Sequence, residues 1–158
     1  MEHTVDISQM KVSNRAEDVL VTYSLGSCIA LSVYDPAARV GGLIHAMLPL
    51  SKIDPAKART NPQMFVDTGV PALLQAVFDL GAEPRRLVAK VAGAASLLDE
   101  KGMFRIGQRN CAVLRKVLRK NRVAIAGEDV GGAAARSMYL HMATGQTFVK
   151  SQGRVAEL

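Results

Sequence analysis

Tryptophan is absent from this chain of 158 residues, and aromatic residues make up only 4% of it. Proteins that bind single-stranded nucleic acids stack bases on aromatic side chains, and no such platform can be recognised here. The net charge of +6 would suit an anionic partner of any kind, but charge alone does not choose among nucleic acid, membrane and protein. The scarcity of aromatics therefore argues against nucleic acid.

Long apolar runs and an export signal are also missing. The first ten residues lack the basic start and the apolar block of a signal peptide. Charged residues interrupt every stretch that approaches the roughly 20 apolar residues needed to cross a bilayer. We therefore expect a cytoplasmic protein without membrane insertion, whose two cysteines, Cys28 and Cys111, remain free thiols.

The chain has enough apolar side chains, 49% of its residues, to form one domain over residues 1–158. Its pattern predicts an α/β (α+β) fold with a mixed β-sheet and packed helices. Strands are expected within residues 5–12 and 19–23, in a hairpin of 29–34 and 40–48, at 87–91 and 123–126, and in a hairpin of 137–149 about Thr144-Gly145. Helices are expected over 61–81, kinked or restarted at Pro71, and from near Gly107 to 122, with an exposed loop at 51–61 and a turn at 128–132.

The candidate for chemistry is Cys28, which follows the small pair Gly26 and Ser27. Such a pair permits a sharp turn that exposes the sulfur and leaves backbone N–H groups to face an oxyanion. His45 lies on the returning strand of the predicted hairpin, where its imidazole could hold Cys28 as a thiolate. The hydroxyl of Thr22 could accept from the second ring nitrogen of His45 and fix its tautomer.

Each of these residues also has an ordinary structural explanation. A lone cysteine is usually a small buried apolar residue, and a lone histidine is usually packed or on the surface. The spacing of Cys28 and His45 leaves both readings open. The other candidate residues give weaker evidence of function. Cys111 is expected in the core and His3 and His141 are expected to be structural, while the basic helix over residues 105–122 presents a solvated face or a docking surface.

A longer set of motifs resembles the CheD family of chemoreceptor glutamine deamidases. The resemblance covers nearly the whole chain. Its motifs are Thr22, Leu25-Gly26-Ser27-Cys28, Tyr34-Asp35-Pro36, Arg39-Val40-Gly41-Gly42, His45, Leu48-Pro49, Phe65-Val66-Asp67, Ile106-Gly107, Arg109-Asn110, Glu128-Asp129-Val130-Gly131-Gly132, Arg136 and Thr144-Gly145.

The resemblance implies that Cys28 and His45 are catalytic and that Thr22 completes the site. It further implies a layered fold similar to the catalytic domain of cytotoxic necrotizing factor toxins. The substrates would be glutamines of methyl-accepting chemotaxis receptors, converted to glutamate through a thioester with no metal or organic cofactor. The alternative is a non-catalytic regulator that binds receptors or a CheC-type phosphatase.

Two departures from the family pattern concern the substrate channel more than the chemistry. Residues 92–95 read Ala-Gly-Ala-Ala where the family usually has Phe-Gly-Gly-Ala, and Ala135 replaces a glycine that often precedes the arginine.

Overall fold

The computed structural model describes residues 1–96 and 105–158, and its strands form two five-stranded sheets. The first sheet has the strand order β1-β3-β8-β9-β10, with only β1 and β3 parallel. Its strands are β1 (Glu2–Thr4), β3 (Val19–Leu25), β8 (Arg136–His141), β9 (Gln146–Ser151) and β10 (Arg154–Glu157). The second has the order β2-β5-β4-β6-β7, with only β6 and β7 parallel. Its strands are β2 (Gln9–Ser13), β4 (Ile29–Asp35), β5 (Val40–Ala46), β6 (Val88–Gly93) and β7 (Ile125–Val130).

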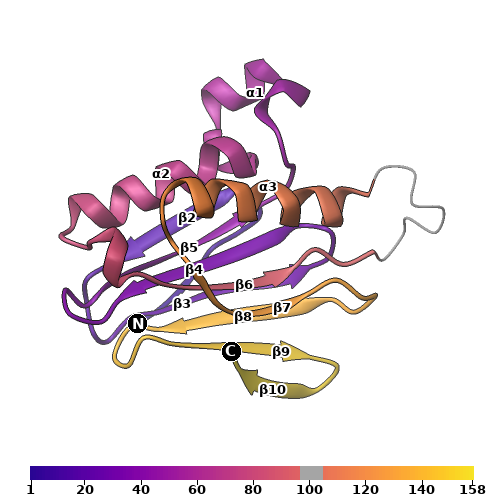
Figure 1. Cartoon of the computed structure of the whole chain (residues 1–158). Helices are drawn as coiled ribbons and strands as arrows, with labels where there is room; N and C mark the ends of the chain where they lie inside the picture. The colour runs from indigo at the N-terminus through magenta and orange to yellow at the C-terminus, as the bar shows by residue number, and fades with distance from the viewer. Residues whose placement is uncertain (97–104) are drawn as a thin grey trace.

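The α-helices of the described residues lie on one side of the second sheet, as Figure 1 shows. They are α1 (Pro55–Thr60), α2 (Val66–Asp79) and α3 (Ile106–Lys120), accompanied by 3₁₀ turns at Ser51–Ile53, Pro62–Met64 and Pro84–Arg86. One apolar cluster joins α2 and α3 to the second sheet, and another joins the two sheets. The molecule therefore has three layers, and the predicted α/β class is confirmed.

Strand β4 lies at the centre of this arrangement, and all seven of its residues are buried. Ile29, Leu31 and Val33 face the helices, while Ala30 and Tyr34 face the other sheet. A strand covered on both faces needs apolar residues at nearly every position, which explains why 29–34 is apolar at every position except Ser32. The predicted hairpin of β4 and β5 is confirmed, as is that of β8 and β9.

Two expectations about local structure are wrong, and of the two alternatives at Pro71, a kink or a restart, the restart is excluded. The segment 51–61 is not a loop: Pro55 begins helix α1, and the carboxylate of Asp54 caps it by accepting from the N–H of Lys57 at 3.1 Å. Helix α2 does not restart at Pro71, because the buried face of the helix outweighs one missing hydrogen bond. Strand β7 runs on to Val130 through parallel pairing with β6, so the turn begins only at residue 131.

The two ends of the chain also differ from the prediction. A single strand was expected within residues 5–12, but β1 ends at Thr4 and β2 begins at Gln9, and they belong to different sheets. The connection between them passes from one sheet to the other. Strand β10, which pairs with β9, was not anticipated because its residues are all exposed and show no apolar alternation.

Gly93, the last residue of β6, brings the backbone against the Cys28 segment. Its φ is +107°, and a methyl group on its Cα would overlap the carbonyl oxygen of Cys28. The next residue, Ala94, donates its N–H to that same oxygen at 2.8 Å. Only glycine allows this close approach.

We predict that Gly93→Ala destabilises the protein by about 1–3 kcal/mol more than Gly131→Ala, because overlap is added to an unfavourable φ. Gly131 is the matched control, since its φ is +82° but an added methyl group would meet nothing within 4 Å. The measurement is the free energy of unfolding in urea. Equal losses for the two variants would contradict the steric argument.

Candidate functional site

The strand pairing brings the predicted site residues to the layer between the two sheets. Thr22 lies in β3 of one sheet and His45 in β5 of the other, and both are buried. Cys28 lies in the bend between β3 and β4 and belongs to the apolar cluster between the sheets. With 9% of its surface exposed, against 3% for His45 and none for Thr22, Cys28 is the member nearest to solvent.

The oxygen atom of Thr22 fixes the tautomer of His45. Oγ1 of Thr22 lies 2.7 Å from Nδ1 of His45 and 2.6 Å from the carbonyl oxygen of Val5. A hydroxyl has one proton, and the carbonyl can only accept, so this proton goes to Val5. Nδ1 must then donate to Oγ1, which leaves Nε2 of His45 without a proton and ready to act as a base. Nε2 is buried and has no hydrogen-bond partner among the described residues.

The register of β4 and β5 brings His45 and the segment of Cys28 to the same end of the hairpin. His45 pairs directly with Ala30, and Cys28 lies two residues before Ala30. Cys28 precedes the first residue of β4, Ile29, and lies in the bend before it. Among the described residues no hydrogen bond joins its sulfur to Nε2 of His45. The predicted hairpin is confirmed, whereas direct contact between the two side chains stays a prediction.

Burial shifts the pKa of both groups. It raises the pKa of the Cys28 thiol above its usual value, although the backbone N–H of Cys28 opposes the shift. It lowers the pKa of His45 to about 4, against a smaller opposing effect of Asp6. Both shifts favour a neutral thiol and a neutral imidazole, rather than the resting thiolate expected from the sequence.

The same shift makes His45 a source of pH-dependent stability. The unfolded chain takes up a proton on His45 below pH about 6.5, whereas the folded protein resists it until pH about 4. This contribution to the free energy of unfolding is therefore complete above pH about 6.5 and is lost as the pH falls toward 4.

The carbonyl groups around the cysteine are all held in place. The oxygen of Gly26 accepts from the N–H of Ala95 at 2.9 Å, and that of Cys28 accepts from the N–H of Ala94 at 2.8 Å. The oxygen of Ser27 accepts from the side chain of Asn110 at 3.0 Å. In a trans peptide the N–H of the following residue points opposite to the carbonyl. The N–H groups of Ser27 and Cys28 therefore point in the direction opposite to the carbonyls of Gly26 and Ser27. Neither has a main-chain acceptor in the described part of the chain.

Asn110 and Arg136 were not recognised as site residues from their chemistry. Asn110 is fully buried on α3, and Arg136, also buried, donates to the carbonyl oxygens of Gly93 and Gly131 and pairs with Asp129 at 3.2 Å. A signal for Asn110 was present in the sequence. It lies on the buried face of α3, whose other members are Gly107, Leu114 and Leu118. A polar residue at such a position needs a partner.

The remaining candidates lie elsewhere. Cys28 and Cys111 are unpaired, as expected, and Cys111 is partly buried against the core beneath α3. His3 contacts Asp18 at 3.1 Å and His141 packs edge-on against Phe148. Within residues 1–96 and 105–158, no three His, Cys, Asp or Glu side chains are grouped as metal ligands would be.

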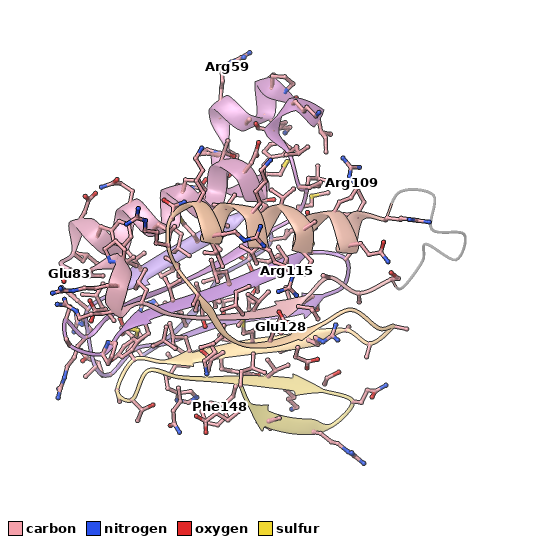
Figure 2. All side chains as sticks on the ribbon, in the orientation of Figure 1. Arg59, Glu83, Arg109, Arg115, Glu128 and Phe148 are labelled. Atoms are coloured by element: carbon pink, nitrogen blue, oxygen red, sulfur yellow. The ribbon has the colours of Figure 1, made fainter. Side chains whose placement is uncertain are left out.

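The basic face of α3 is partly neutralised. Figure 2 shows Arg115 on this helix above Glu128 on β7, and the two form an ion pair at 2.8 Å. The described helices include none that is long and apolar enough to span a membrane.

A cysteine and an imidazole base in one layer, with the base oriented by a hydroxyl, are an arrangement found in hydrolases that use a cysteine nucleophile. Residues 47–151 match the family model described as CheD chemotactic sensory transduction. A protein of Syntrophus aciditrophicus named "probable chemoreceptor glutamine deamidase CheD 1" is 52% identical, over 94% of this chain and 93% of its own length. A protein of Solibacter usitatus with a similar name is 47% identical, over 98% of this chain and 91% of its own length.

The chain therefore belongs to the CheD family, as its motifs suggest. Among solved structures, a hypothetical protein of Bacillus licheniformis called YfiH has a TM-score of 0.48 and 12% identity, over 78% of this chain and 49% of its own.

The raised pKa of Cys28 predicts slow reaction with alkylating agents at neutral pH. We expect the rate of alkylation of Cys28 by iodoacetamide, followed by peptide mass mapping, to keep rising above pH about 8.5. The urea-unfolded chain, in which the thiol has its ordinary pKa, is the control. A rate that is already constant below pH about 7 would instead indicate a resting thiolate.

Proposed function

We propose that this protein is a chemoreceptor glutamine deamidase, which hydrolyses the side-chain carboxamide of receptor glutamines to glutamate and ammonia. The names of its relatives supply the substrate class. The observation that carries the chemistry is the hydrogen bond between Thr22 and His45, because it leaves Nε2 of His45 as an unprotonated base in the layer that contains Cys28. In chemotaxis such a reaction alters the charge of the receptor.

In the first half of the reaction, Cys28 becomes acylated. Nε2 of His45 takes the proton of the Cys28 thiol as the sulfur attacks the carboxamide carbon. The carbonyl oxygen becomes an oxyanion, which the N–H groups of Ser27 and Cys28 stabilise. The imidazolium then returns its proton to the nitrogen, the carbon–nitrogen bond breaks, and ammonia leaves a thioester on Cys28.

In the second half, water releases the product. Nε2 of His45 takes a proton from a water molecule, and the resulting hydroxide attacks the thioester carbon. The carbon–sulfur bond breaks, the thiolate recovers the proton from His45, and the glutamate side chain departs. Throughout, the hydroxyl of Thr22 accepts from Nδ1 and stabilises the transient imidazolium. None of these steps calls for a metal or an organic cofactor.

The neutral resting pair agrees with this sequence of proton transfers. A proton must move from Cys28 to His45 within the complex, so the base has to be unprotonated beforehand. With a pKa of about 4, His45 is unprotonated at neutral pH. The thiolate of Cys28 therefore forms only as the sulfur attacks the carbon of a bound carboxamide.

The direct test is intact mass spectrometry of a purified chemoreceptor cytoplasmic fragment incubated with the protein. We expect the wild type to add about one dalton for each modified glutamine, and Cys28→Ala and His45→Ala to add none, because both groups take part in bond formation. Cys111→Ala is the matched control and should behave as the wild type. Receptor fragments that bind but keep their mass would point to a regulator instead.

The role of Thr22 can be separated from its packing. Thr22→Val keeps the shape but removes the acceptor of Nδ1, so we expect kcat to fall about 10–100-fold, the loss seen for groups that orient a metal-ligating histidine. Thr22→Ser keeps the hydroxyl and should retain most of the activity. The measurement is the initial rate of ammonia release, and equal rates for the Val and Ser variants would exclude this role.

A further inference from the structure

We propose that Asn110 is a positioning residue that orients the peptide between Ser27 and Cys28, so that the N–H of Cys28 faces the oxyanion. The inference rests on the proposed function, in which this N–H is a donor to the reacting group. It adds a residue of helix α3 to a site otherwise built by strands.

The amide of Asn110 forms two hydrogen bonds. Nδ2 donates to the carbonyl oxygen of Ser27 at 3.0 Å and to that of Met47 at 3.1 Å. Both partners are acceptors, so the orientation of the amide is determined by its surroundings and Oδ1 must face the other way. Figure 2 labels the adjacent Arg109, which marks the end of α3 where this contact is made.

These two hydrogen bonds connect Asn110 to the segment that carries the nucleophile and to the segment that carries its base. Ser27 precedes Cys28, and Met47 follows His45 by two residues. Asn110 therefore holds the start of β4 and the end of β5 at a common point on α3. The same amide therefore fixes the direction of the Ser27 carbonyl against a second, independent acceptor.

The Ser27 carbonyl depends on a side chain, unlike its neighbours. Backbone N–H groups of Ala95 and Ala94 hold the carbonyls of Gly26 and Cys28, whereas only Asn110 among the described residues holds that of Ser27. Because the peptide is planar, the direction of this carbonyl sets the direction of the Cys28 N–H. One side chain thus controls one oxyanion donor.

The choice of asparagine is not explained by packing. Asn110 is fully buried, and within residues 1–96 and 105–158 its Oδ1 has no hydrogen-bond partner. An apolar residue such as the Leu114 that follows on the same face would avoid an unpaired buried acceptor. A residue retained at such a cost is expected where its two donors are needed.

The test compares two reactions of Cys28 in Asn110→Ala and Asn110→Asp. Deamidation of a chemoreceptor fragment passes through an oxyanion, whereas alkylation by iodoacetamide does not. We expect kcat for deamidation to fall about 100-fold or more, with little change in KM or in the alkylation rate. Asn110→Asp keeps the side-chain volume and replaces the donor, so it serves if Asn110→Ala does not fold.

Asn121→Ala is the matched control. Asn121 lies just after the other end of α3 and donates Nδ2 to a single carbonyl, that of Val117, at 2.8 Å. Its loss should leave both reactions unchanged. If deamidation and alkylation fall together in the Asn110 variants, or if neither falls, the proposed role is wrong.

A second measurement decides the proposal even if the wild type fails to deamidate any receptor. The ¹⁵N relaxation order parameter of the Cys28 amide should be near 0.85 in the wild type and in Asn121→Ala, and fall below about 0.6 in the Asn110 variants. A Cys28 amide that stays rigid without the side chain of Asn110 would overturn the inference. Loss of deamidation by the wild type alone would overturn only the proposed function.

Discussion

The hydrogen bond from His45 to Thr22 is the interaction on which the site depends, because it crosses between the two sheets. Burying an imidazole between sheets is costly unless its donor is paired. Thr22 can accept only because its own proton goes to the carbonyl of Val5, at the point where the chain leaves β1 for the other sheet. The segment that passes from β1 in one sheet to β2 in the other thus supplies the carbonyl of Val5, the third group in this chain of hydrogen bonds. The fold thereby determines which nitrogen of His45 is a base.

A second set of contacts fixes the backbone on the other side of Cys28. The two residues after β6 donate their N–H groups to the carbonyls of Gly26 and Cys28. The carbonyl of Gly93, the last residue of β6, accepts from Arg136 and from the N–H of Gly131. The buried guanidinium of Arg136 therefore acts on the cysteine through the main chain. Since β6 is hydrogen-bonded to β4 along its whole length, the bend that contains Cys28 is supported from strands on both sides.

Sequence patterns predicted those parts of the fold that depend on neighbouring residues. The hairpin of β4 and β5 follows from its apolar runs and the Asp35-Pro36 turn, and the pairing of Thr22 with His45 follows from the chemistry of a histidine that needs an orienting acceptor. Features set by distant pairing were missed. Strand β7 extends to Val130 because β6 pairs with it, and the residues of β7 alone do not indicate that pairing. Asn110 is part of a family motif, but its contacts with Ser27 and Met47 depend on how α3 packs, which the local sequence does not determine.

In the part of the chain that the structure describes, two buried side-chain atoms lack a hydrogen-bond partner: Nε2 of His45 and Oδ1 of Asn110. The first shares the layer of Cys28, and the second lies on a residue that contacts the Cys28 segment. Each costs stability, since a buried polar atom that has lost water and gained nothing is destabilising by about 1–3 kcal/mol. Apolar replacements would remove this cost, so folding alone does not account for either residue. Sites where local rules are broken are expected to be functional. For His45 the reason is direct, because a base that already held a hydrogen bond at Nε2 would have to give it up before taking the proton of a thiol.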